Sequence, residues 1–235
     1  MSNLAFHNDP QLAELVRGQV AAHAAADEIA QGVYWENGKG CFIGCIAHSN
    51  DPARVEELTG FPVLLTKLAE GIFEGLPNEQ AKAFRPRAMN APRVGASLDL
   101  VGWKFLHWLV EDVLREHGTD DVRTGCAAAL AVLADKAEGR EVTADAAYTA
   151  ARAAYTAADA TYTAADATAR AARAAAYTAA RAAYTAADAA AYAARAARAA
   201  AYAADAAAYA ARAAGAADAA RIRQADKFVE LLTNA

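Results

Sequence analysis

Cysteine is scarce in this sequence, and no segment resembles a secretion or membrane signal. Three cysteines in 235 residues, Cys41, Cys45 and Cys126, are too few for a disulfide framework and are typical of a reducing compartment. The first residues lack a basic segment followed by an apolar run, and no apolar stretch of about 18 residues is free of charge. We therefore expect a cytoplasmic protein without a signal peptide or a membrane span.

An excess of positive charge is also absent. The 23 Lys and Arg residues are outnumbered by 28 Asp and Glu residues, which gives a formal net charge of −5. This balance argues against nucleic acid as the main partner, because binding to a phosphate backbone depends on clustered cations.

Proline is missing from a long alanine-rich tract, in which glycine occurs once. Residues 144–220 include 48 alanines in 77 positions, with Gly215 as the single glycine. Alanine is the best helix former and proline the worst, so the tract predicts helix. One unbroken rod would be about 115 Å long at 1.5 Å per residue. The alternative is a turn near residues 161–170 that folds the tract into an antiparallel helical hairpin.

Tyrosines and charged residues share one face of this predicted helix. At about 100° per residue the tyrosines lie within a sector of about 120°, and an Arg or Asp follows or precedes each by three or four residues. We call this face the tyrosine stripe. Its residues are Tyr148, Arg152, Tyr155, Asp159, Tyr162, Tyr177, Arg181, Tyr184, Asp188, Tyr192, Arg195, Tyr202, Asp205, Tyr209 and Arg212, with Asp145, Asp166 and Arg173 on the same face.

This pattern inverts the usual amphipathic helix, whose large apolar residues face the core. The alanine back allows another backbone to approach closely, while the stripe is either a solvated face or an interaction surface. Tyr and Arg are enriched at binding hot spots, so we expect an interaction surface. The expected partner is a protein or a second copy of the chain, for example in an antiparallel dimer. Seven Arg and six Asp in the tract nearly cancel, which does not favour a polyanion.

The rest of the chain predicts a mainly α fold: a small helical domain with one β-hairpin. Helices are expected at 11–30, from 52, at 62–74, from 79, at 98–116 and at 126–137, and Asp51 and Thr143 are expected N-caps. Asn37-Gly38 between two apolar runs predicts the type I′ turn of a hairpin near 33–44. The expected domains are 1–140, an alanine-rich helical rod at 141–220, and an amphipathic C-terminal helix at 221–235.

The one cluster of residues that could bind a ligand or carry out chemistry lies around the hairpin. Cys41, Cys45 and His48, with His23, Asp27 and Glu36 as possible neighbours, suggest zinc or a Cys–His nucleophile pair, although CxxxC departs from the usual CxxC spacing. Gly38-Lys39-Gly40 could form an anion-binding nest. Free cysteines are commonly buried core residues, however.

We therefore expect no metal, no cofactor and no catalytic residue. Lys39, Cys41, Cys45 and His48 remain an alternative site for an anionic ligand or for a small enzyme. His107, inside an apolar helix, is expected to be a core histidine.

Several of these motifs resemble a family of proteins from bacteria and their phages. The motifs are the segment from Gly32 to Cys45, the turn from Ile72 to Asn78, the helix segment from Trp103 to Leu109, the alanine-rich tract, and the ending from Ala225 to Leu232. The resemblance covers nearly the whole chain. It implies no catalytic residue, and it implies a setting in mobile elements, where small proteins bind and redirect host or phage machinery.

Overall fold

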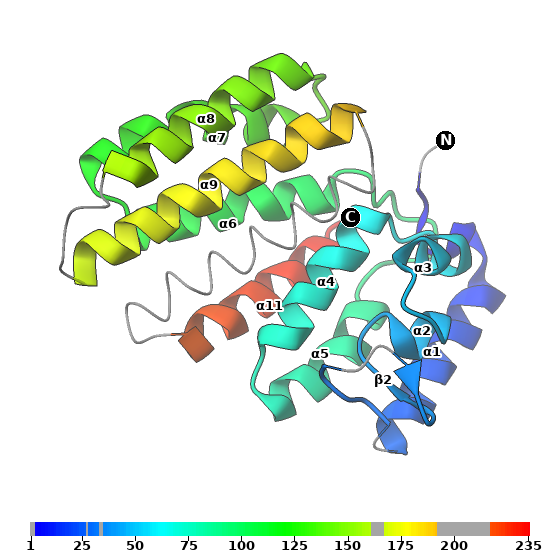
Figure 1. The fold of residues 1–235 in the computed structure, drawn as a ribbon. Helices are drawn as coiled ribbons and strands as arrows, with labels where there is room; N and C mark the ends of the chain where they lie inside the picture. The colour runs from blue at the N-terminus through cyan, green and yellow to red at the C-terminus, as the bar shows by residue number, and fades with distance from the viewer. Residues whose placement is uncertain (1–2, 27, 33–34, 161–166, 192–216) are drawn as a thin grey trace. The chain divides into compact units, whose positions relative to one another are not determined.

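The computed structural model describes residues 3–26, 28–32, 35–160, 167–191 and 217–235, and contacts divide the chain into two compact units (Figure 1). The first unit joins Met1–Val101 to Arg221–Ala235, and the second is Gly102–Ala220. The described part is mainly α with one two-stranded hairpin, as predicted. The division differs from the expected boundary near residue 140, because the helices that follow residue 101 group with the alanine-rich tract.

The first unit consists of short helices and the hairpin. Its elements are the 3₁₀ turn η1 (Ala5–Asn8), α1 (Pro10–Ala25), β1 (Trp35–Glu36), β2 (Lys39–Gly40), α2 (Gly44–Ala47), α3 (Pro52–Thr59), α4 (Val63–Gly75), α5 (Asn78–Asn90) and α11 (Ala217–Thr233) from Arg221 onward. Asp51 caps α3 as predicted, because its carboxylate accepts a hydrogen bond from the Ala53 amide at 2.9 Å. Helix α1 ends at Ala25, five residues before the expected end.

The hairpin has the predicted turn but shorter strands. Trp35 pairs with Gly40 and Glu36 with Lys39. Asn37 and Gly38 both have positive φ, 51° and 79°, as a type I′ turn requires. Residues 42–43, which we expected in the second strand, lead into α2 instead.

The C-terminal helix α11 completes the core of the first unit. The fully buried ring of Phe84 on α5 lies 6.1 Å from that of Phe42 and 5.9 Å from that of Phe228 on α11. At the surface Arg87 forms an ion pair with Asp226 at 2.7 Å. Residues far apart in the sequence therefore share one core.

The second unit consists of α6 (Val101–His117), α7 (Asp120–Ala137), α8 (Ala144–Ala160) and α9 (Ala167–Ala191) within the described residues. Thr143 caps α8 as predicted and accepts from the Ala146 amide at 3.2 Å. Helix α7 starts six residues earlier than expected, because Thr119 supplies an N-cap. In the part of the chain that the structure covers, no helix is long and apolar enough to cross a membrane.

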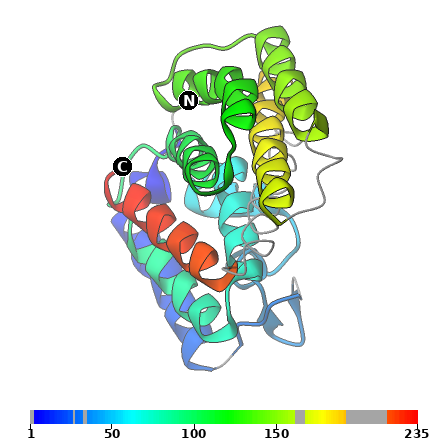
Figure 2. The ribbon, with the colours of Figure 1, turned by 90° about the vertical axis from the view of Figure 1, so that its left-hand side faces the viewer.

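The alanine-rich tract does not form the single rod that we expected. Helices α8 and α9 are separate and pack side by side, and α7 packs against both (Figure 2). Tyr148 contacts Tyr184 while Tyr155 contacts Tyr177, so the two helices run antiparallel. Over the described residues 144–160 and 167–191, the two antiparallel helices correspond to the alternative fold, the helical hairpin. A bare alanine rod has no neighbour to cover its back, whereas the hairpin buries that back within the unit.

A glycine permits the close approach of α7 and α8. A Cβ atom added at Gly125 on α7 would lie 2.4 Å from the Cβ of Ala157 on α8. This separation is far below van der Waals contact, so the two backbones pack at a distance that only glycine allows.

We predict that Gly125→Ala destabilises the protein by about 1–3 kcal/mol, because the added methyl forces the two helices apart. The matched control is Gly18→Ala on α1, where an added Cβ meets nothing within 4 Å. Helix propensity alone should then stabilise the chain by up to about 1 kcal/mol. Urea unfolding followed by circular dichroism measures both variants, and effects of the same sign would contradict the packing argument.

Candidate functional site

The tyrosine stripe forms a seam where α8 and α9 meet. The ring centroids of Tyr148 and Tyr184 are 5.4 Å apart, and Tyr155 lies 5.5 Å from both Tyr177 and Tyr184. These inclined and edge-on contacts suit the quadrupoles of aromatic rings. The described rings therefore contact one another within one chain.

On α9 the stripe is the partly exposed edge of the helix. Between residues 172 and 186, the side chains that are not buried are Arg173, Tyr177, Arg181 and Tyr184. The other positions in this range, nearly all alanine, are buried. The alanines thus make the interior, and the large polar and aromatic residues make the rim.

On α8 the stripe is more exposed. Tyr148 is 48% exposed, Arg152 is exposed, and Tyr155 is half-buried. Across the seam, partial burial raises the pKa of Tyr184 and the neighbouring Tyr148 raises it further, so this phenol remains neutral at physiological pH. The described stripe therefore presents phenol rings beside guanidinium groups.

The predicted stripe extends beyond the described residues. Tyr162, Asp166, Tyr192, Arg195, Tyr202, Asp205, Tyr209 and Arg212 lie outside the described residues, as do the side chains of Asp159 and Asp188.

Cys41, the first of the two cysteines that follow the hairpin, contacts a buried carboxylate. Its Sγ donates a hydrogen bond to Oε1 of Glu70 on α4 at 2.9 Å, and both residues are buried. Burial is the main cause that raises the pKa of both groups, so each favours its protonated form. Glu74 lies close enough for Cys41, Glu70 and Glu74 to bring one ligand atom each within 4.8 Å of the others. A metal there would require release of the Cys41 proton, which burial opposes.

Cys45 lies beside a buried arginine. Its Sγ donates to the Gly40 carbonyl at 3.1 Å, and burial raises its pKa although the neighbouring Arg85 guanidinium opposes the rise. Arg85 on α5 is fully buried and donates to the Val20 carbonyl at 3.2 Å, while its Nε and Nη1 atoms have no hydrogen-bond partner among the described residues. A thiol with a raised pKa is a poor nucleophile, so this environment gives little support to Cys–His catalysis.

His48 joins a different group, which is built on α1 and the hairpin. Its Nε2 lies 3.4 Å from Nε2 of His23, and its ring stacks on Trp35 with centroids 4.2 Å apart. His23 in turn bonds through Nδ1 to Oε2 of Glu28 at 2.6 Å. Of the predicted ligand site, Cys41 and Cys45 thus direct their thiols to Glu70 and to the Gly40 carbonyl, while His48 pairs with His23. Lys39 is exposed on β2.

Sequence reasoning missed Glu70, Arg85, Glu28 and Trp35. The helices of Glu70 and Arg85 and the strand of Trp35 were predicted, whereas Glu28 follows α1 at a position where helix was expected. Their tertiary partners carry no local signal, because these contacts join distant segments. The expectation for His107 was wrong: its side chain is 27% exposed and pairs with Glu111 of the next turn at 3.5 Å.

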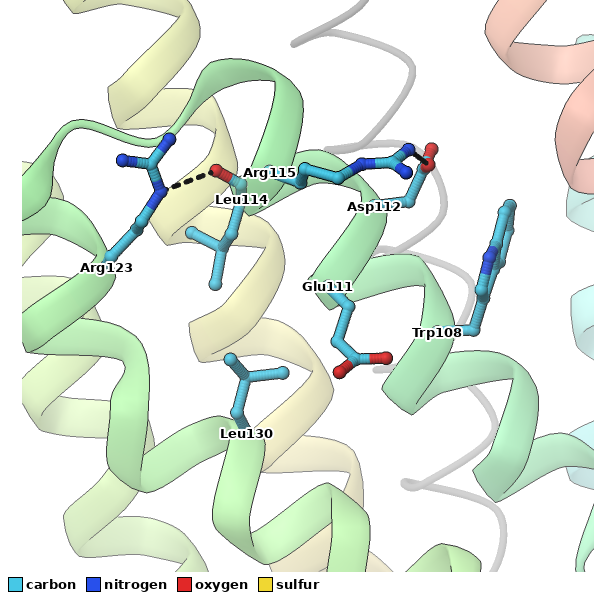
Figure 3. Close-up of a pocket in the computed structure, with 7 residues that line it drawn as sticks. All are labelled: Trp108, Glu111, Asp112, Leu114, Arg115, Arg123 and Leu130. Atoms are coloured by element: carbon cyan, nitrogen blue, oxygen red, sulfur yellow. Dashed lines mark hydrogen bonds and ion pairs between the residues drawn. The ribbon is translucent and has the colours of Figure 1, made fainter.

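A further hollow lies in the second unit, with a volume of about 630 Å³ and walls from α6 and α7 (Figure 3). Its lining residues are Trp108, Glu111, Asp112, Leu114, Arg115, Arg123 and Leu130. Arg115 forms an ion pair with Asp112, and Arg123 donates to the Leu114 carbonyl at 3.2 Å (Figure 3). Because these guanidinium groups already bond to residues of the same unit, the lining of the hollow does not indicate which charge a ligand would carry.

Comparison with protein-family models, with curated proteins and with solved structures found no match to this chain. The resemblance to bacterial and phage proteins therefore remains a prediction.

We predict that Cys41, Cys45 and Cys126 react slowly with Ellman's reagent in the folded protein at pH 8. All three are buried, and burial raises the pKa of Cys126 to about 12. Above pH 9, where thiols of the unfolded chain ionise, stability should fall, because the folded state keeps these thiols protonated.

The positive control is Ala128→Cys, an exposed position on α7, which should react at once. Fast stoichiometric labelling of the parent protein would show that at least one native thiol is accessible and ionisable. It would restore the case for thiol chemistry.

Proposed function

We propose that this chain is a non-catalytic binding protein that captures a protein partner on the seam of α8 and α9. One observation carries the proposal. In the described part of α9 between residues 172 and 186, the fold leaves Arg173, Tyr177, Arg181 and Tyr184 partly exposed and buries the rest.

The composition of this seam suits protein recognition. Tyr148, Tyr155, Tyr177 and Tyr184 supply large rings with few rotatable bonds, and Arg152 lies on the same face. Tyr and Arg are the residue types enriched at binding hot spots, and a tyrosine ring loses little conformational entropy on contact. Ring contacts across the seam also hold the surface in one arrangement, which lowers the entropic cost of binding.

The internal pairing of the rings favours a foreign protein over a second copy. An antiparallel dimer through tyrosine fronts would use contacts that α8 and α9 already make with each other. The cytoplasmic setting and the association with mobile elements belong to this proposal as well, since a captured host or phage protein would be met there.

Site-specific photo-crosslinking in producing cells tests the proposal. A benzoylphenylalanine at position 148 should give one discrete adduct, whose partner mass spectrometry identifies. The matched control is position 15, because Leu15, 69% exposed on α1, is the other large exposed hydrophobic residue of the described chain. Equal adduct patterns at the two positions would contradict a specific surface, and an adduct of two identical chains would assign the seam to self-association.

With the partner in hand, Tyr148→Ala combined with Arg152→Glu should weaken the complex at least about 30-fold, the effect of losing one hot spot. Arg54→Glu, a charge reversal at an exposed site in the first unit, serves as the control and should leave affinity unchanged. Isothermal titration calorimetry measures affinity, and circular dichroism checks that helix content is retained. If the double variant bound with unchanged affinity, the stripe would be a solvated face and not the binding surface.

A further inference from the structure

Two histidine nitrogens converge on one point in the first unit. His23 lies on α1 and His48 follows α2, and their Nε2 atoms are 3.4 Å apart. Whether a metal ion can bind between them depends on which ring nitrogens carry protons, and the neighbouring groups indicate the positions of those protons.

The proton of His23 belongs on Nδ1. This nitrogen lies 2.6 Å from Oε2 of Glu28, and a carboxylate accepts but does not donate. In the neutral imidazole, Nε2 of His23 therefore presents a lone pair.

Nε2 of His48 presents a lone pair as well. The Gln19 amide nitrogen lies 3.0 Å from the Cys45 carbonyl and 3.2 Å from Nε2 of His48. An atom that contacts a carbonyl oxygen at this distance must be the NH₂ group, so the amide orientation is fixed. Its second N–H points to Nε2 of His48, which accepts through its single lone pair, while the Ile46 carbonyl lies 3.5 Å from the same amide nitrogen and offers that N–H another acceptor.

A metal ion between the two Nε2 atoms would take the lone pair of each, and the Gln19 N–H that His48 accepts would then move to the Ile46 carbonyl. The separation has the size that a metal ion requires, because two Zn–N bonds of about 2.0–2.1 Å at a tetrahedral angle place their nitrogens about 3.3–3.4 Å apart. The bond from His23 to Glu28 is the carboxylate–histidine arrangement that orients metal-bound imidazoles and raises their basicity.

The His48 ring is held in place for this role. Its stacking on Trp35 is nearly parallel, with 13° between the planes, and Trp35 also meets the His23 ring edge-on at 5.5 Å. His48 adopts a left-handed backbone, with φ 51° and ψ 35°, a conformation that glycine or asparagine adopts more readily.

We propose that His23 and His48 bind a divalent transition-metal ion, with Zn²⁺ as the ion tested, through their Nε2 atoms. Glu28 positions His23, and two coordination positions remain for water or an exogenous ligand. The thiols of Cys41 and Cys45 take no part. This proposal is independent of the protein-binding seam, which lies in the other unit.

Zinc titration of the full chain, followed by competition with a chromophoric chelator, tests the proposal. We expect one Zn²⁺ per chain, and tetrahedral Co²⁺ absorption when cobalt replaces zinc. His48→Asn, which keeps a residue suited to the left-handed backbone, should weaken binding at least about 100-fold. Glu28→Gln should weaken it about 10–100-fold.

Two matched controls should bind like the parent: His107→Gln, a partly exposed histidine of the second unit, and Cys45→Ala in the first. Loss of binding in Cys45→Ala with His48→Asn unaffected would overturn the ligand assignment. If the parent protein bound zinc no more tightly than His48→Asn does, the proposed site would be wrong.

Long-range ¹H–¹⁵N spectra provide a measurement that needs no variant. Before zinc is added, both Nε2 atoms should show the shift of an unprotonated nitrogen. Zinc should then move the signals of His23 and His48 and leave those of His7, His107 and His117 in place. A proton on Nε2 of His48, or movement of the other histidines alone, would contradict the proposal.

Discussion

The packing of small side chains against one another governs the second unit. Alanine carries a single methyl group, so helices lined with it can approach until their backbones nearly touch. The approach is especially close where Gly125, which has no side chain, faces Ala157. Each buried methyl contributes only about 0.8 kcal/mol, so stability must come from many such contacts along long helices. In the described part of α9, nine alanines between Ala172 and Ala186 are buried.

Close approach also decides where large residues go. A tyrosine between two alanine-packed helices would force them apart, so Tyr148, Tyr155, Tyr177 and Tyr184 lie at the rim, where rings from both helices meet. The surface that we propose for recognition is therefore a consequence of the interior. A substitution that widens the spacing of the helices should change the arrangement of the rings as well.

Local sequence signals predicted the elements that depend on a few neighbouring residues. The caps by Asp51 and Thr143 and the Asn37-Gly38 turn each rest on a hydrogen bond or a backbone angle within three residues. The antiparallel return of the alanine tract was harder to predict. Alanine repeats carry no breaker, and the advantage of folding back appears only when two distant segments cover each other.

The dependence on contacts between distant segments also explains why the sequence did not predict the arrangement of the candidate site in the first unit. The spacing of Cys41, Cys45 and His48 suggested one ligand set, but spacing says nothing about direction. Folding turns Cys41 toward Glu70 and Cys45 toward a carbonyl, where burial keeps their protons in place. His48 instead meets His23, which lies 25 residues earlier on another helix. The site that we propose thus depends on the residues that accept and donate around each imidazole, since these partners decide which nitrogen is left with a lone pair.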